Sequence, residues 1–300
     1  MATRGDDDST DLAAGLSSRE LLVVIIGDYW HGCTSPIPSA ALVAMLAEFD
    51  ISAANARAAL SRLSRRGTLA VRREGRRTFY SVTEETAEWA RERGRMLMRF
   101  GLDWPSWDGR WTVVAFSLPD DANRSGPALR AALRRLGLAQ LYDGLWVTPH
   151  DLRAGLGELL AEQGVVASTV LRADVASLPA KSRDPIEAWD LTGLQERYVR
   201  FIHQLERLAT RVDGGRIEPA ESLVVRTAVT LGWRKFVYDD PRLPLELLPP
   251  DWPMLAAREA FQDVYDRLGP LAEARAREVV APFDLPDPSQ PRHHTVADSM

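Results

Sequence analysis

The chain has 300 residues, of which 45% are hydrophobic, a composition ordinary for a folded protein of two or three domains. Its longest apolar run, Leu21 to Gly27, is far shorter than the ~20 residues that span a bilayer, and no apolar segment typical of a signal peptide follows Met1. The net charge is −5, and Cys33 is the only cysteine, which excludes an intramolecular disulfide. We therefore expect a protein of the reducing cytoplasm that does not enter a membrane.

The order of the predicted elements indicates an α+β fold with three folded domains, at residues 17–100, 101–180 and 181–283. Residues 1–16 are polar and acidic. Residues 284–300 are rich in proline and poor in apolar side chains. Segments of such composition bury too little apolar surface to fold, so we expect a disordered tail at each end.

Three helices are predicted at the start of the first domain, each preceded by a capping residue. Ser17 and Glu20 form the capping-box pattern, before a helix that continues to about residue 32. Ser39 precedes a second helix, and Ser52 precedes a third. Only a short turn separates the second helix from the third, which is the helix-turn-helix arrangement.

A β-hairpin is predicted directly after the third helix. Its strands are residues 69–73 and 76–83, and Gly75 supplies the positive φ that a tight turn needs. Thr83 then caps a longer helix over residues 84–100. A hairpin that follows a recognition helix defines the winged form of the helix-turn-helix, so we predict a winged helix-turn-helix in residues 17–100.

The second and third domains differ in their predicted elements. A β-α-β-β-α-β order indicates a ferredoxin-like sandwich, with elements at residues 111–118, 125–136, 138–142, 144–148, 152–163 and 165–171. The third domain is predicted to be helical, with amphipathic segments at residues 191–212, 223–238 and 256–280.

Positive charge is concentrated in the predicted third helix and hairpin. The window from Ser52 to Arg77 holds eight arginines and one acid, Glu74, so it carries +7 while the rest of the chain carries −12. A solvated surface with no ligand is the simplest alternative, but it does not explain this segregation beside a helix-turn-helix. Duplex DNA is the partner that the pattern favours.

The two faces of the third helix suggest how it could read DNA. At 100° per residue, Ala53, Ala56, Leu60 and Leu63 form one stripe that we expect to pack inward. On the opposite side, an asparagine can pair with adenine, an arginine with guanine, and an alanine methyl can touch thymine. Ser52 and the adjacent amides can hold a phosphate. The expected DNA-binding residues are Ser52, Asn55, Arg57, Ala58, Ser61, Arg62, Arg65, Arg66, Arg72, Arg73, Arg76 and Arg77.

Four stretches together resemble one family, the PaaX-like repressors of phenylacetic acid degradation. The resemblance covers about residues 17–280, and it rests on residues 58–67, 75–80, 107–111 with 144–149, and 240–253. It implies a homodimeric transcriptional repressor that binds a double-stranded DNA operator. It also implies the winged, ferredoxin-like and helical domains in this order, and release from DNA by a small-molecule effector. In the namesake branch that effector is an aryl-acyl-CoA, phenylacetyl-CoA.

The central domain also resembles the small nuclease subunit of the CRISPR adaptation complex. In those nucleases an aspartate at the end of the first strand binds metal, and Ser117 stands at that position here. Serine is a poor ligand for a divalent cation, so we expect no catalytic residue, metal or cofactor. Asp120 and Asp121 are better placed to stabilise a helix start. A metal-dependent nuclease and a non-specific nucleic-acid-binding assembly module remain the alternatives.

Nine tryptophans are many for this length, and two interpretations of them stay open. Aromatic side chains commonly fill interfaces between domains, which is the favoured interpretation. They could instead line an apolar acyl pocket, with cations nearby to meet CoA phosphates. The effector-binding candidates on that hypothesis are Trp233, Arg234, Lys235, Arg242 and Trp252.

Overall fold

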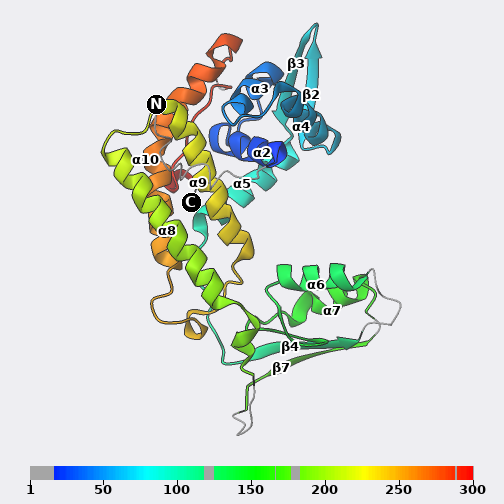
Figure 1. Ribbon diagram of the computed structural model, residues 1–300. Coiled ribbons are helices and arrows are strands. Elements are labelled where there is room, and N and C mark those ends of the chain that lie inside the picture. Colours follow the sequence, from blue (N-terminus) through cyan, green and yellow to red (C-terminus); the bar gives the residue numbers. More distant parts are fainter. Residues whose placement is uncertain (1–16, 118–124, 166, 177–182, 288, 300) are drawn as a thin grey trace. The chain divides into compact units, whose positions relative to one another are not determined.

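The computed structural model describes residues 17–117, 125–165, 167–176, 183–287 and 289–299 (Figure 1). It is an α+β protein with two compact units. The first combines the N-terminal 100 residues with residues 199–237 and the C-terminal residues from 254 onward. The second contains residues 101–198 and 238–253. No helix of the described residues is both long and apolar enough to cross a membrane.

Three short helices open the first unit: α2 (Ser18–Tyr29), α3 (Ser39–Ala47) and α4 (Ala53–Arg65). Ser17 and Glu20 form the predicted capping box on α2, and the Ser52 hydroxyl accepts a hydrogen bond from the Asn55 amide at 3.3 Å on α4. The predicted cap of α3 was wrong. Its N-cap is Pro38, which has no side-chain hydrogen bond to offer, and Ser39 is the first helical residue.

A three-stranded antiparallel sheet combines the hairpin after α4 with a short strand before α3. Strands β2 (Leu69–Glu74) and β3 (Arg77–Val82) form the predicted hairpin, and the two-residue strand β1 (Ile37–Pro38) adds to the other edge of β3. Gly75 has a φ of 57° in the turn, and a residue with a side chain would be strained in this conformation. The next helix, α5 (Glu84–Arg99), is capped by Thr83 as expected.

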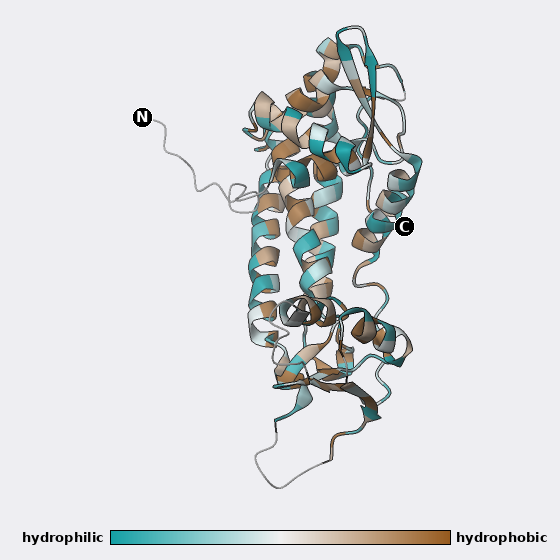
Figure 2. Ribbon diagram, turned by 90° about the vertical axis from the view of Figure 1, so that its right-hand side faces the viewer, coloured by the Kyte–Doolittle hydropathy of each residue, from teal (hydrophilic) through white to brown (hydrophobic). Residues whose placement is uncertain are grey.

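The helical part contains α8 (Leu191–Asp213), α9 (Pro219–Asp239) and α10 (Met254–Val280), along whose ribbons polar and apolar residues alternate (Figure 2). The 3₁₀ turns are η1 (Pro185–Ala188), η2 (Leu245–Leu247), η3 (Ala281–Phe283) and η4 (Ala297–Ser299).

One hydrophobic core serves both the N-terminal helices and the helical part. Leu22, Leu42 and Leu60 belong to the same buried cluster as Leu231 of α9 and Ala276 of α10. This cluster therefore joins residues of the parts expected at 17–100 and 181–283. Side chains of α9 and α10 cover an apolar surface that α2, α3 and α4 would otherwise expose, and removing that surface from water is favourable.

The C-terminal segment also differs from expectation. The described residues after Asp284 pack against the first unit, and the side chains of Leu285, Ser289 and Val296 are 5%, 1% and 1% exposed. Few of these residues are apolar, so hydropathy gave no sign of packing. Hydrogen bonds of the segment's backbone hold it in place. The N-terminal residues 1–16, also expected as a disordered tail, lie outside the described residues.

The second unit contains a four-stranded antiparallel sheet of order β5-β6-β4-β7. Its elements are β4 (Trp111–Ser117), α6 (Ser125–Arg135), β5 (Ala139–Tyr142), β6 (Leu145–Thr148), α7 (Arg153–Glu162) and β7 (Ala167–Ala173). Helices α6 and α7 lie on one side of the sheet, where Trp146 and Val114 meet Leu133 (Figure 1). Trp111 and Val147 on the other side pack against the segment around Trp189 and η2.

Candidate nucleic-acid interface

Helix α4 has one buried face and one exposed face. Ala56, Leu60 and Leu63 are buried as predicted, and Ala59 joins them. Ala53, expected to face inward, is exposed, and it is the first residue of the helix. The small exposed residues near the start of α4 leave that end of the helix narrow.

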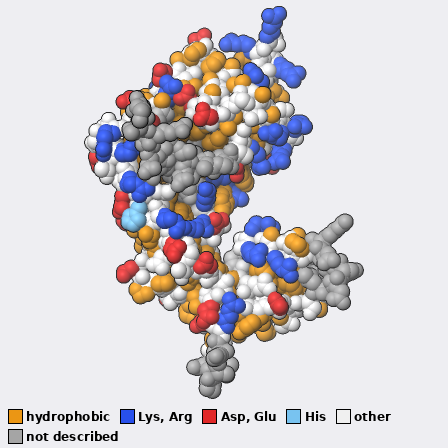
Figure 3. Space-filling view, viewed as in Figure 1, with side chains coloured by type: hydrophobic (Ala, Val, Ile, Leu, Met, Phe, Trp, Pro, Cys, Tyr) orange, Lys and Arg blue, Asp and Glu red, His pale blue; other side chains and the backbone are white. Residues whose placement is uncertain are grey.

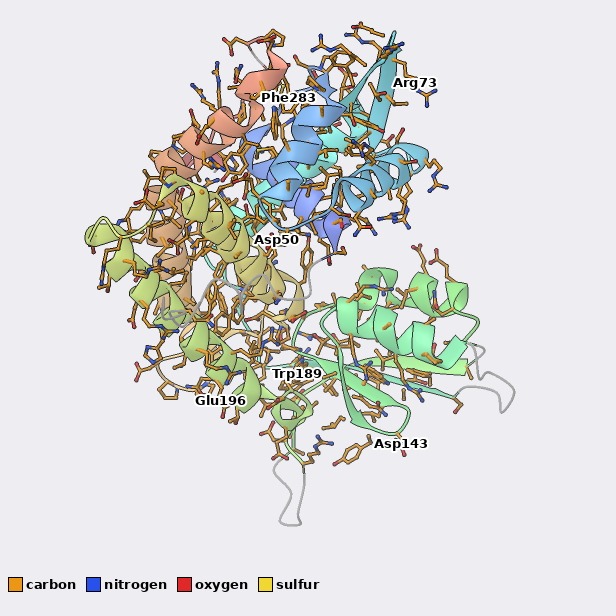
Figure 4. All side chains as sticks on the ribbon, turned by 45° about the horizontal axis from the view of Figure 1, so that its top comes forward. Asp50, Arg73, Asp143, Trp189, Glu196 and Phe283 are labelled. Carbon is orange, nitrogen blue, oxygen red and sulfur yellow. The ribbon has the colours of Figure 1, made fainter. Side chains whose placement is uncertain are left out.

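All twelve residues predicted to bind DNA are exposed, and they lie on α4, at its two caps or on the hairpin. Lys and Arg side chains gather over these elements, at the upper right of the space-filling view (Figure 3). Arg73 extends from the hairpin away from the rest of the molecule (Figure 4). The fold therefore places residues that are up to 25 positions apart in sequence, Ser52 and Arg77, within one continuous structural region.

The charge of this surface is largely uncompensated. Arg72 forms an ion pair with Glu74 at 2.9 Å, and its guanidinium lies over the Phe79 ring, 5.6 Å from the centroid. None of the described residues forms an ion pair with the other seven arginines of the Ser52–Arg77 window. Exposed cations without intramolecular partners are free to neutralise an external polyanion.

The start of α4 offers polar groups that could hold an anion. The Ser52 hydroxyl oxygen accepts the Asn55 amide, which leaves its own proton available for donation. The amides of the first helical turn point out of the helix end, where the helix dipole favours negative charge. A phosphate is an anion of suitable size for this position.

The turn that precedes α4 is fixed to a distant helix. Arg275 of α10 donates two hydrogen bonds to the Glu48 carboxylate, at 2.8 and 3.0 Å. Two residues later, Asp50 adopts a left-handed conformation with a φ of 58°. Sequence reasoning missed Glu48 and Arg275 as positioning residues because 227 positions separate them, and neither occurs in a recognisable motif.

Three of the effector candidates lie in the first unit, at the end of α9. Trp233 is fully buried, its indole N–H donates to the Leu97 carbonyl at 2.9 Å, and its ring stacks on Phe261 at 5.0 Å. These contacts make Trp233 a core residue in this structure, with no surface for a ligand. Arg234 is half-buried and Lys235 is exposed.

The other two candidates, Arg242 and Trp252, belong to the second unit. The Trp252 ring meets the edge of Tyr198 at 6.1 Å, and the Tyr198 hydroxyl donates to buried Asp240 at 2.6 Å. The Arg242 amide donates to the same carboxylate at 2.7 Å. Burial raises the pKa of Asp240, and these two hydrogen bonds oppose the shift.

Two features of this cluster are unusual. Arg242 has a φ of 53°, which is rare for a residue with a long side chain. The buried indole N–H of Trp252 has no hydrogen-bond partner among the described residues. Strained backbone and unsatisfied polar groups often occur at binding sites, so Arg242 and Trp252 remain candidates.

Within the described residues, no group of three or more His, Cys, Asp and Glu side chains could hold a metal ion. Ser117 is the exposed last residue of β4. Asp120 and Asp121 lie outside the described residues.

Comparison with protein-family models identifies all three parts of the chain. Residues 17–86 match the PaaX-like protein model, residues 105–184 the PaaX protein central Cas2-like domain, and residues 189–278 the PaaX-like protein C-terminal domain. The chain belongs to the PaaX-like family. The resemblance inferred from the four sequence stretches is therefore confirmed.

Two individual proteins extend this result. The transcriptional repressor PaaX of Escherichia coli K12 is 28% identical over 276 residues, which are 89% of this chain and 85% of the repressor. An uncharacterized protein of Mycobacterium tuberculosis has a solved structure that matches 88% of this chain and 99% of its own length, with a TM-score of 0.54 and 23% identity. The first likeness supports a transcriptional repressor, and the second shows that the fold recurs.

Proposed function

We propose that this PaaX-like protein is a sequence-specific transcriptional repressor that binds an operator in double-stranded DNA as a homodimer. Residues 17–100 act as a winged helix-turn-helix, in which α4 enters the major groove and the β2–β3 hairpin is the wing. The observation that carries the proposal is the set of exposed arginines without intramolecular partners on these two elements.

The roles of the individual residues follow from their positions. Asn55, Ala58, Ser61 and Arg62 lie on the exposed face of α4 and read base edges. The hairpin arginines contact phosphates, or the minor groove, and fix the register without reading sequence. Ser52 and the amides beside it hold one phosphate at the start of α4.

The remaining parts of the chain assemble and regulate the winged helix-turn-helix of residues 17–100, which we call the reading head. The strand order β5-β6-β4-β7 supports a ferredoxin-like fold for the βαββαβ unit, and we assign this unit to dimerisation. A small-molecule effector, for which an aryl-acyl-CoA is the leading candidate, binds outside the winged domain near Arg242 and Trp252. It stabilises a dimer whose two recognition helices no longer match the operator half-sites.

The test is a triple variant, Arg62→Gln, Arg76→Gln and Arg77→Gln. Each lost phosphate contact lowers the salt slope of log K by about 0.9, so loss of the two hairpin arginines should lower it by about 1.8 per chain, and loss of Arg62 should weaken base discrimination. The protein should be assayed by fluorescence anisotropy on a duplex recovered by selection from genomic fragments. Circular dichroism and thermal unfolding establish that the variant is folded.

A matched control removes three arginines from the second unit: Arg110→Gln, Arg130→Gln and Arg135→Gln. All three are exposed, and this variant has the same net charge as the first. It should bind the selected duplex within about twofold of wild type, since distant exposed charges are screened at physiological salt. Undiminished binding by the first triple variant, or equal losses in both, would contradict the proposal.

A further inference from the structure

The C-terminal segment contacts the end of helix α2. The Trp30 indole N–H donates to the Ser289 carbonyl at 2.8 Å, and the Arg292 amide donates to the Tyr29 carbonyl at 2.9 Å. Trp30 is 2% exposed, so its indole N–H has no access to water in place of this partner. We call residues 285–287 and 289–298 the C-terminal strap.

The strap also contacts the two long helices α9 and α10. Arg226 of α9 donates to the His294 carbonyl at 2.8 Å. On α10, the Glu273 carboxylate accepts the His293 amide at 2.9 Å, and the Asp266 carboxylate accepts the Val296 amide at 2.8 Å. The strap is thus bonded on one side to α2 and on the other to the helical part.

A buried polar cluster joins the same three elements. Arg226 is fully buried, and its guanidinium lies 3.8 Å from the Tyr265 ring centroid. The Asp28 carboxylate of α2 accepts hydrogen bonds from Thr230 at 3.1 Å and from Tyr265 at 3.4 Å. The Tyr265 hydroxyl also lies 3.1 Å from the His294 ring. Each element therefore satisfies polar groups that the others bury.

We propose that the strap is a clamp that locks α2 onto α9 and α10, so that the reading head and the helical part move as one body. The clamp sets the position from which each recognition helix meets its half-site. The positioning of the recognition helices rests on the proposed function, whereas the lock of α2 onto α9 and α10 concerns the DNA-free protein alone.

Preorganisation gives the physical reason for such a clamp. A dimer that binds two half-sites must hold both heads at a fixed separation, and a loose head must be ordered at the moment of binding. The entropy lost when a loose reading head is ordered weakens binding to the duplex with two half-sites. It matters much less when only one head is engaged, because one head adjusts to one half-site without a constraint from the other.

Gly269 of α10 provides a way to displace the strap without deleting it. A Cβ at this position would collide with the His293 ring, at its Cδ2 atom and at 3.1 Å from its Cγ. Pro270 follows Gly269, and a Cβ on the residue before a proline disfavours the helical conformation, so the double variant Gly269→Ala with His293→Ala is needed to separate this local effect from the collision with the ring. Gly27→Ala in α2 is the matched control, since nothing lies within 4 Å of its added Cβ.

The first measurement is amide hydrogen exchange of the DNA-free protein. Gly269→Ala should speed exchange in peptides from both the strap and the C-terminal half of α2, whereas Gly27→Ala should leave the strap peptides unchanged. Gly269→Ala combined with His293→Ala removes the colliding ring and should restore slow exchange. Faster exchange in the strap alone, with α2 unchanged, or unchanged exchange in both, would overturn the clamp.

The second measurement uses a duplex selected from genomic fragments, and the same duplex with one half-site scrambled. Gly269→Ala should weaken binding to the intact duplex by about tenfold and to the scrambled duplex by less than twofold, with no change in salt slope. Equal affinity of wild type and variant for the intact duplex would overturn the DNA role of the clamp. Failure of the wild type to select any duplex would refute the proposed function, and the exchange result would still decide whether the clamp exists.

Discussion

Two sets of arginines in the first unit show how position determines the role of one residue type. Arg62, Arg76 and Arg77 are exposed, and no described residue forms an ion pair with them. Arg226 is fully buried and donates to the carbonyls of Tyr265 and His294. The first set can pair with anions outside the chain, whereas Arg226 donates to acceptors within the chain.

This chain uses arginine almost exclusively as its cation. Of 37 Lys and Arg residues, only Lys181 and Lys235 are lysines. Arginine identity therefore indicates nothing about nucleic acid. What distinguishes the candidate interface is exposure combined with a lack of intramolecular ion pairs, and both are properties of the fold.

The largest effect is expected at the buried arginine. Arg226→Ala removes the side-chain hydrogen bonds to the Tyr265 and His294 carbonyls and the cation that most favours the charged Asp28 carboxylate. Breaking a buried charged network by removal of one partner costs about 3–5 kcal/mol. Urea unfolding measures the change, and exposed Arg130→Ala should stay within about 0.5 kcal/mol of wild type. A cost below about 1 kcal/mol for Arg226→Ala would show that the cluster is not structural.

At the exposed surface, the sharpest effect is one of sequence preference. If Asn55 pairs with an adenine, Asn55→Ala should lose about 1–3 kcal/mol of discrimination at one base pair and leave the salt slope unchanged. Arg66→Gln should instead weaken binding to all sequences alike and lower the slope. Selection of bound duplexes by both variants separates these outcomes, and an unaltered base preference in Asn55→Ala would remove Asn55 from the reading face.

Most helices and the hairpin could be predicted from the sequence because their signals are local. The capping box of Ser17 and Glu20, the cap of Ser52 and the turn at Gly75 each lie within four residues of the structure that they specify. The strap had no such signal. Its stability depends on hydrogen bonds to residues such as Trp30, 259 positions away from Ser289.

In the candidate sites, too, residues set by local periodicity could be predicted, and residues set by distant contacts could not. The α4 residues could be placed on one face because helical periodicity fixes their direction, although Ala53 at the helix start escaped the packing of its stripe. The sequence alone did not decide whether Trp233 lines a pocket or fills a core. Tryptophan suits both a pocket and a core, and only the stack on Phe261 and the bond to Leu97 show that it fills a core.

Acid should loosen the buried cluster through His294. Burial lowers the pKa of His294 to about 3, and the charge of Arg226 adds to this shift. The folded protein therefore keeps His294 neutral while the unfolded chain takes up a proton below about pH 6.5, so stability falls as pH falls through this range. The loss amounts to about 2 kcal/mol between pH 7.5 and 5.

Urea midpoints at pH 7.5 and 5 test this prediction, and His294→Gln should lose much less stability between them. The raised pKa of Asp28 acts in the opposite sense, because its carboxyl gains a proton in the folded protein first, and it offsets part of the loss. An equal pH dependence in wild type and His294→Gln would assign the effect to other groups.

The smallest effect concerns the one interface arginine that already has an internal partner. Glu74 pairs with Arg72 at 2.9 Å, and both side chains are more than half exposed, so the pair contributes little to stability. Glu74→Gln frees Arg72 and removes the one negative charge from the window, and we expect DNA to bind about twofold to fivefold more tightly at low salt. Anisotropy titrations at two salt concentrations measure the gain, and Glu92→Gln, which frees Arg95 of α5 from a similar exposed pair, is the matched control. A gain confined to Glu74→Gln would locate the bound phosphates at the hairpin, whereas an equal gain from both variants would mean that net charge alone decides binding and that the two sets of arginines differ less than their surroundings indicate.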